Sequence, residues 1–250
     1  MAQPRAGCRV RGSGFVHILV IGGAGRVARW VVPHLRRNLD VTTFDRVAPA
    51  DIVGDALDPS SVATAMTGVD AVVHLAVVVP RGEEEEDPDV LREAWAVNVG
   101  SWWLALDQGR RAGVRTFIHG STMSVHARFG IDPMPDPAGT EPDATRAYGF
   151  SKRVAETAGC LYARQFGLHV TSLRLAFPTP DDVAPAWLRP DTGQATTVVL
   201  SDGSVVPATK ASRVAEFIER GLTFRGEYQC LDVTGVGTRR GTRSSTRPHG

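Results

Sequence analysis

The chain has 250 residues, of which 42% are hydrophobic and 22% are charged, and its net charge is +1. This length predicts one domain, or one domain with a small appendage, and the balanced charge gives no indication of a nucleic-acid or acidic-membrane partner. No apolar run approaches the roughly 20 residues that cross a bilayer. The three cysteines are widely spaced, which excludes a metal-binding spacing or a disulfide framework and favours a reducing cytoplasm.

Strand-like and helical segments alternate along the chain. Strands are predicted at 17–21, 40–44, 51–53, 71–79, 115–119, 169–175 and 228–233, and helices at 26–37, 60–67, 89–112, 148–166 and 212–222. Such alternation predicts an α/β fold with a parallel sheet that is covered on both faces, the doubly wound Rossmann type.

The ends of the chain differ in composition from its middle. Residues 1–14 and the basic stretch 235–250 are expected to be flexible, because they lack apolar periodicity. Between them we expect a main domain at 15–178 and a small cap at 179–234 that completes the fold. The acidic run Glu83–Glu86 lies in a polar connection and is expected to be a solvated loop, with a gate over the site as the alternative.

A glycine-rich turn follows the first predicted strand. Gly22-Gly23-Ala24-Gly25-Arg26-Val27-Ala28 has the spacing G-x-x-G-x-x-A, in which glycines let the backbone approach a pyrophosphate at a helix N-terminus. Asp45 ends the second strand, where a carboxylate accepts the ribose hydroxyls of NAD and repels a 2′-phosphate. The following Arg46 keeps NADP open as the alternative. The domain at 15–178 is therefore expected to bind NAD(P), and the cap at 179–234 to bind the substrate. The expected cofactor contacts here are Gly22, Gly25, Arg26, Val27 and Asp45.

Tyr148 and Lys152 are four residues apart in a chain whose only other lysine is Lys210. On a helix this spacing places both side chains on one face. An ammonium beside a phenol lowers the pKa of the phenol, which suits proton exchange with an alcohol or a carbonyl group. An incidental pair on a surface helix is the alternative interpretation.

Taken together, the motifs resemble the extended or atypical short-chain dehydrogenase/reductase superfamily, which includes sugar epimerases and uronate dehydrogenases. The resemblance covers roughly residues 16–235. The matching segments, in chain order, are 22–28, 54–55, 74–76, 98–100, 117–122, 148–152 and 173–178. Members of this superfamily often form homodimers through their two long helices, so the resemblance implies a homodimer. Trp102 and Trp103, in one of these helices, are expected to serve in packing or in this interface.

The resemblance also implies roles for individual residues around the cofactor. Asp55 would bind the adenine amino group, although it is also suited to capping a turn. Asn98 would lie behind the active site and hold the long helix in register, and it is also counted among the expected cofactor-binding residues. Phe177 and Pro178 would lie near the nicotinamide carboxamide. The remaining expected cofactor contacts are Ala56, Leu75, Ala76, Val77, Ser121, Tyr148 and Lys152.

The superfamily places a catalytic hydroxyl at the end of the fifth strand. The alignment assigns this role to Thr122, with Ser121 on the cofactor side and Ser124 as the alternative in a shifted register. Met123 and Arg174 are expected to contact substrate with Thr122, and a structural ion pair is the alternative for Arg174. His126 replaces the usual tyrosine and is expected to be a pocket wall or a surface residue.

The expected activity is NAD-dependent oxidation or reduction of a secondary alcohol or carbonyl in a small sugar-like or biosynthetic substrate. Thr122, Tyr148 and Lys152 would be catalytic, and no metal is expected. The short region after Pro178 favours a small substrate, and Met123-Ser124 in place of Asp-Glu disfavours dehydration. A sugar epimerase with retained cofactor is the first alternative. A non-catalytic dinucleotide-binding regulator is the second, and the presence of all three catalytic residues argues against it.

Overall fold

Seven parallel strands form one sheet with the order β13-β6-β5-β4-β1-β2-β3, which confirms the predicted α/β class. The computed structural model describes residues 16–131 and 140–235, so the segment 1–14 and the tail from 236 lie outside the described residues. The strands are β1 (His17–Ile21), β2 (Asp40–Asp45), β3 (Ile52–Val53), β4 (Ala71–His74), β5 (Thr116–Thr122), β6 (His169–Leu175) and β13 (Tyr228–Val233).

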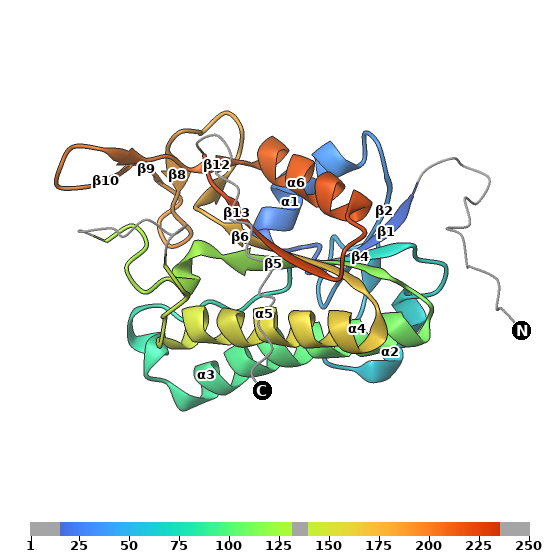
Figure 1. Cartoon of the computed structure of the whole chain (residues 1–250). Coiled ribbons are helices and arrows are strands. Elements are labelled where there is room, and N and C mark those ends of the chain that lie inside the picture. The colour runs from blue at the N-terminus through green and yellow to red at the C-terminus, as the bar shows by residue number, and fades with distance from the viewer. Residues whose placement is uncertain (1–15, 132–139, 236–250) are drawn as a thin grey trace, which may run out of the picture.

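Helices cover both faces of the sheet (Figure 1). Helices α1 (Arg26–Leu35) and α6 (Ala211–Thr223) pack side by side on one face. The opposite face carries α2 (Pro59–Ala65), α3 (Pro88–Trp95), α4 (Trp102–Arg111) and α5 (Ala147–Phe166). This is the doubly wound arrangement, in which right-handed crossovers carry the chain from strand to strand.

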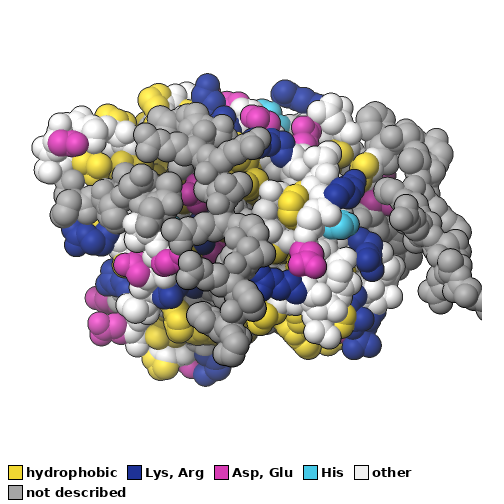
Figure 2. Space-filling model, viewed as in Figure 1, with side chains coloured by type: hydrophobic (Ala, Val, Ile, Leu, Met, Phe, Trp, Pro, Cys, Tyr) yellow, Lys and Arg dark blue, Asp and Glu magenta, His cyan; other side chains and the backbone are white. Residues whose placement is uncertain are grey.

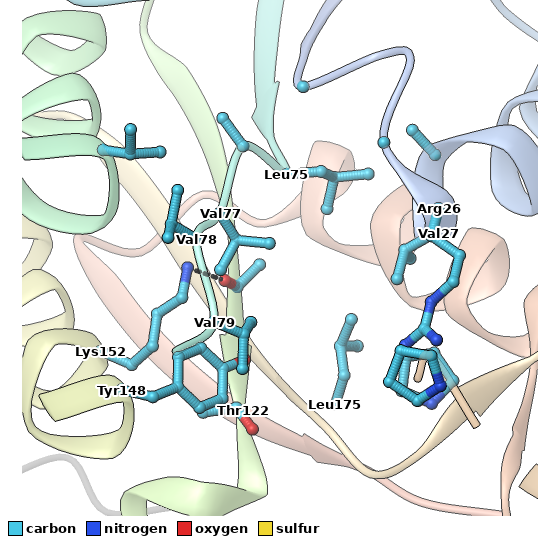
Figure 3. A pocket seen from close by; sticks show the side chains of 18 of the residues that line it. Arg26, Val27, Leu75, Val77, Val78, Val79, Thr122, Tyr148, Lys152 and Leu175 are labelled. Atoms are coloured by element: carbon cyan, nitrogen blue, oxygen red, sulfur yellow. Dashed lines mark hydrogen bonds between the residues drawn. The ribbon is translucent and has the colours of Figure 1, made fainter. Parts of the chain in front are cut away.

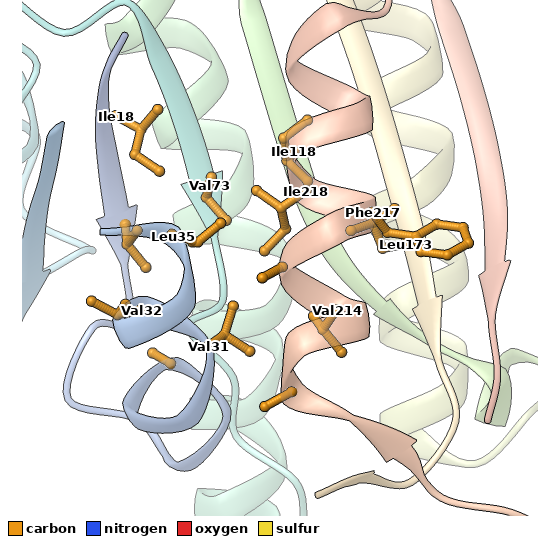
Figure 4. Packing of buried hydrophobic residues seen from close by; sticks show 14 of the residues in the cluster. Ile18, Val31, Val32, Leu35, Val73, Ile118, Leu173, Val214, Phe217 and Ile218 are labelled. Carbon is orange, nitrogen blue, oxygen red and sulfur yellow. The ribbon is translucent and has the colours of Figure 1, made fainter. Parts of the chain in front are cut away.

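Apolar spacing explains each layer. On the first face, α1 buries Val31, Val32 and Leu35, and these side chains meet Val214 and Ile218 of α6 over the central strands (Figure 4). Residues three and four apart share one side of a helix, so this pattern forms a continuous apolar stripe. On the second face the core contains the fully buried side chains Trp102, Phe44 and Phe117. Burial of each large apolar side chain contributes about 1.5–3 kcal/mol.

Two predicted elements differ most from those in the structure, and the side chain of Asn98 connects them. Strand β4 ends at His74 rather than at residue 79. Beyond it, the amide of Asn98 accepts a hydrogen bond from the Val78 backbone N–H and donates one to the Val78 carbonyl, both at 2.9 Å. The expected helix 89–112 contains a π-helical segment, Ala96–Ser101, at this same asparagine. Wide turns of this kind often mark functional sites.

The region after β6 contributes both to the sheet layers and to a set of short strands. These are β7 (Pro178–Thr179), β8 (Trp187–Leu188), β9 (Ala195–Thr196), β10 (Val198–Val199), β11 (Val205–Val206) and β12 (Thr209–Lys210). Helix α6 and strand β13 then return to the main fold, beside α1 and β6.

The surface view shows acidic and basic side chains interspersed, in accord with the small net charge (Figure 2). No helix within the described residues has the length and apolar character to cross a membrane.

Candidate active site

A cavity of about 740 Å³ opens at the carboxyl ends of the parallel strands. Ligands of open α/β sheets bind at this edge, and the volume is in the range of small-molecule sites. Its wall brings together segments that are far apart in sequence. The sequence-predicted residues that line it are Gly22, Gly25, Arg26, Val27, Asp45, Asp55, Ala56, Leu75, Ala76, Val77, Ser121, Thr122, Met123, Tyr148, Lys152, Phe177 and Pro178.

The glycine turn between β1 and α1 has the shape of a phosphate cradle. Gly22 has a φ of 84°, and a Cβ atom added to it would lie 2.3 Å from the Ala76 backbone nitrogen. Only glycine accommodates this conformation and this close approach. No side chain caps α1 at Gly25, so the first N–H groups of the helix are left to face the cavity. The turn therefore fits the pyrophosphate of a dinucleotide.

The carboxylates at the far end of the cavity are held by the backbone. The Asp45 Oδ2 atom accepts a hydrogen bond of 3.0 Å from the Ala24 N–H, which joins β2 to the glycine turn. Arg46, the residue that favoured NADP, pairs with Glu93 at 2.9 Å. Asp55 accepts a hydrogen bond of 2.8 Å from the Leu57 N–H while it also lines the cavity. It therefore caps a turn and remains in reach of a ligand.

Tyr148, Thr122 and Lys152 meet at the other end of the cavity (Figure 3). Tyr148 and Lys152 come from the first two turns of α5, and Thr122 is the last residue of β5. The Thr122 hydroxyl lies beside the phenol (Figure 3) and lowers the pKa of the phenol. The Lys152 ammonium donates a hydrogen bond of 2.8 Å to the Gly120 carbonyl oxygen. The predicted row along one helix face is thus present, and it faces the glycine turn across the cavity.

Burial dominates the electrostatics of this row. It raises the pKa of the Tyr148 phenol above its usual value near 10, and the opposing effects come from the Thr122 hydrogen bond and from the charges of Arg81 and Arg26. The expected lowering of this pKa by Lys152 is therefore not met in this structure. Burial also lowers the pKa of Lys152 to about 8, while the Glu156 carboxylate raises it. At neutral pH the phenol is a proton donor and the lysine is mostly charged.

The hydroxyl at position 122 and its neighbour have different tasks. The Thr122 Oγ1 atom also accepts a hydrogen bond of 3.1 Å from the Ser124 N–H, so Thr122 is fixed beside the phenol. Ser121 lines the cavity, but its hydroxyl donates a hydrogen bond of 2.6 Å to the Glu156 carboxylate. The hydroxyl beside the phenol is therefore that of Thr122, whereas the Ser121 hydroxyl is engaged by Glu156.

Three residues singled out in the sequence lie behind the cavity wall. Arg174 forms a two-pronged ion pair with Glu156, at 2.9 and 2.7 Å, and is outside the cavity lining, so the ion-pair alternative describes it. Asn98 is fully buried and supports Val78 and Ser151 from behind. His126 is buried, and neither ring nitrogen has a hydrogen-bond partner among the described residues. It lines a smaller neighbouring cavity instead of the main one.

Sequence reasoning missed an aromatic wall. Phe177 packs against Phe129 and Trp187, with ring centroids 5.6 and 5.1 Å apart, and all three rings line the cavity. Phe177 also has a φ of 46°, which is uncommon for a residue other than glycine and is enriched at functional sites. Arg81 was missed too, and its position after β4, at the ligand-binding edge of the sheet, was an available signal. Other unpredicted lining residues are Val78, Val79, Glu93 and Pro190.

Known proteins resemble this chain at the level of family and fold. A family model described as the NAD dependent epimerase/dehydratase family matches residues 18–179. The UDP-glucose 4-epimerase of Corynebacterium glutamicum is 34% identical over 168 residues, which cover 63% of this chain and 50% of the relative. The NAD-dependent glucose-6-phosphate dehydrogenase of Haloferax volcanii is 30% identical over 181 residues, which cover 63% and 67% of the two chains.

Among solved structures, a short-chain dehydrogenase/reductase superfamily protein from Agrobacterium tumefaciens with bound NAD superposes with a TM-score of 0.71. That alignment has 20% sequence identity and covers 87% of this chain and 77% of that protein, so it supports the fold. The chain spans half or less of the length of the first curated relatives that it matches.

Proposed function

The chain belongs to the NAD dependent epimerase/dehydratase family, and from this premise we propose that it is an NAD-dependent oxidoreductase for a secondary alcohol or carbonyl group of a small, sugar-like substrate. The observation that carries the proposal is the meeting of Tyr148, Thr122 and Lys152 in the same cavity as the glycine turn. A protein that only binds a dinucleotide does not require these three side chains together.

The cofactor end of the cavity supports NAD. Gly22, Gly25 and the start of α1 would hold the pyrophosphate, Asp45 would bind the adenosine ribose, and Asp55 with Ala56 would border the adenine. Arg26 lines the same turn, and its guanidinium is 3.4 Å from the Leu188 carbonyl oxygen, so it joins the cradle to the short-strand region. When bound, NAD supplies the hydride acceptor or donor.

The protein residues handle the proton. The Tyr148 phenol would donate a proton to the substrate oxygen during reduction and would receive it during oxidation. Thr122 would orient that oxygen through its hydroxyl, which lies beside the phenol (Figure 3). Lys152 would bind the nicotinamide ribose with its ammonium group. Its buried position places this charge close to the reacting groups, where water screens it least.

The substrate end of the cavity favours a ring-shaped molecule. The wall formed by Phe129, Phe177 and Trp187 offers flat apolar faces to a ligand. In small-molecule sites such rings supply contact area, and a few polar groups fix the orientation of the ligand. Thr122 and Met123 would contact the substrate from β5 and its end. Relatives named as glucose-6-phosphate dehydrogenase and uronate dehydrogenase support a small sugar derivative.

Sugar epimerisation is the second candidate, because the relative from C. glutamicum is named as a UDP-glucose 4-epimerase. Both reactions use the same proton and hydride machinery, but they differ in the fate of the cofactor. An epimerase keeps its nicotinamide through the whole cycle, whereas a dehydrogenase releases NADH with each turnover.

The test measures both properties on the purified full chain. The nucleotide content is determined after denaturation, and NADH formation is followed with NAD and a panel of neutral sugars, sugar acids, sugar phosphates and nucleotide sugars. Stoichiometric NADH release would support the dehydrogenase. Product interconversion with retained NAD would support the epimerase. Failure to bind NAD, or binding without turnover of any panel member, would contradict the proposal.

We also propose a homodimer formed through α4 and α5. Trp103 of α4 is 47% exposed and Leu161 of α5 is 59% exposed, whereas Trp102 is fully buried in the core. Large apolar side chains left in contact with water favour an interface. Sedimentation analysis should show a dimer that dissociates in a Trp103→Glu/Leu161→Glu variant, and a monomeric wild type would contradict this arrangement.

A further inference from the structure

Glu156 continues the row of catalytic side chains along α5. It is four residues beyond Lys152 and eight beyond Tyr148, so the three lie on one face of the helix. Its side chain is buried, although a lone buried carboxylate is strongly unfavourable. Three hydrogen bonds compensate: Oε1 accepts from the Ser121 hydroxyl at 2.6 Å and from Arg174 Nε at 2.9 Å, and Oε2 accepts from Arg174 Nη2 at 2.7 Å.

These bonds hold the end of β5, where the catalytic groups converge. Ser121 lies between Gly120, whose carbonyl accepts the Lys152 hydrogen bond, and Thr122, whose hydroxyl meets the phenol. Glu156 and Lys152 thus bind consecutive residues of the same strand. A shift of Ser121 would move both the lysine's acceptor and the catalytic hydroxyl.

The charge of Glu156 also acts on the lysine. Burial lowers the pKa of Lys152, and among the described residues the one charge that opposes this effect is the carboxylate of Glu156. The titratable groups that face Lys152 from the sheet are His74 of β4 and His119 of β5, and burial lowers the pKa of each, which keeps them neutral. The groups that face Glu156 are Arg174 of β6, Tyr228 and Cys230 of β13, and His126 after β5, and Asp232 of β13 lies 3.8 Å from Arg174.

We propose that Glu156 is a positioning residue for the catalytic row: it anchors the end of β5 through Ser121, and its carboxylate keeps the buried Lys152 protonated. Arg174 holds Glu156 in place from the neighbouring strand. The catalytic meaning of this inference rests on the proposed function, but the state of Lys152 is measurable without any substrate.

The composition of the chain permits a direct experiment. Because Lys152 and Lys210 are the only lysines, lysine labelled at Cε gives two NMR signals, and the exposed Lys210 serves as an internal reference. The variant Glu156→Gln keeps the shape and the hydrogen-bond acceptor but removes the charge. We expect the titration midpoint of Lys152 to fall by about one pH unit, in line with the effect of a nearby opposite charge, and the midpoint of Lys210 to stay unchanged.

The matched control is Asp107→Asn on α4. Asp107 is another buried carboxylate paired with arginines, at 2.9 Å from Arg110 and 2.7 Å from Arg111, and it is not among the groups that act on Lys152. This variant should leave the Lys152 midpoint at its wild-type value. An unchanged midpoint in Glu156→Gln, or an equal shift in the control, would overturn the proposal.

A second variant covers the case in which Glu156→Gln does not fold. In Glu156→Gln/Arg174→Met both members of the buried pair are neutral, and such replacements are often tolerated. The Lys152 midpoint should fall in this variant as well, and a wild-type value would overturn the proposal. The readout is separate from the substrate screen, so a failed screen would count against the proposed function and leave the lysine result standing.

Discussion

The Lys152 ammonium donates a hydrogen bond of 2.8 Å to the carbonyl oxygen of Gly120, which ties helix α5 to strand β5. An ammonium has three donors. One donor is used by the Gly120 carbonyl. The other two N–H groups remain for acceptors in the cavity, such as a ribose hydroxyl. The lysine is thus both a structural link and a buried charge in the cavity wall.

Removal of the phenol hydroxyl should abolish most of the activity. We expect Tyr148→Phe to reduce kcat by about 10²- to 10⁴-fold, the usual contribution of general acid–base catalysis, while NAD affinity stays close to wild type. Steady-state kinetics on the best substrate of the panel and a fluorescence titration with NADH measure the two quantities. Tyr162→Phe, on the same helix, is the control, and a Tyr148→Phe enzyme with wild-type kcat would exclude the phenol as the proton donor.

Asp45 should determine the choice between NAD and NADP. In Asp45→Ala the carboxylate that would bind the ribose is lost, together with the acceptor for the Ala24 N–H. We expect NAD affinity to fall by about 10- to 100-fold, the value of a hydrogen bond to a charged group, and the preference over NADP to shrink. Calorimetric titration with both cofactors measures this, with the exposed Asp40→Ala at the other end of β2 as control. Tighter binding of NADP than NAD by the wild type would contradict the assignment.

Burial of the charged Lys152 should lower the stability of the fold. Its pKa in the folded chain is about 8 against 10.5 in an exposed lysine. The burial penalty is therefore complete below pH 8 and disappears as the pH rises toward 10.5. We expect Lys152→Met to raise the free energy of unfolding near pH 7 by about 1–3 kcal/mol, and the difference from wild type to shrink at pH 10.

Urea unfolding of the wild type and Lys152→Met at both pH values measures this effect, and Lys210→Met controls for the loss of a lysine at the surface. A destabilised Lys152→Met at neutral pH would show that the hydrogen bond to Gly120 outweighs the burial penalty.

The buried histidines should make the fold sensitive to mild acid. Burial lowers the pKa of His74 from 6.5 to about 3, and the pKa of His119 is also well below 6.5. The unfolded chain therefore binds protons below pH 6.5 that the folded chain does not, and stability falls as the pH falls. Between pH 6.5 and pH 5 we expect a loss on the order of 2 kcal/mol for each histidine.

Urea unfolding at pH 7, 6 and 5 tests this sensitivity. The variant His74→Gln keeps a polar partner for Ser101, which is 2.8 Å from the His74 Nε2 atom, and should show about half of the wild-type loss if His119 contributes equally. A wild-type stability that is flat over this range would contradict the neutral buried state of both rings.

Several features of the site followed from local sequence patterns alone. The glycine turn, Asp45 at a strand end, and the Tyr148–Lys152 spacing are each patterns within one element or one turn. The residues of all three patterns line the cavity. The alternation of strand and helix predicted the parallel sheet for the same reason, since periodicity is a local property. Arg174 shows the limit, because its strand was predicted correctly while its partner Glu156 lies on a different element.

The sequence by itself determined the elements, their order and the residues at the ends of the strands, because these depend on spacing over a few neighbouring positions. The tertiary structure alone decided which polar groups are buried together: Glu156 with Arg174 and Ser121, Asn98 with Val78, and the aromatic wall around Phe177. Those contacts join residues that are distant in the chain, and burial, which sets the pKa values of Tyr148 and Lys152, exists only once the sheet and its helices have packed.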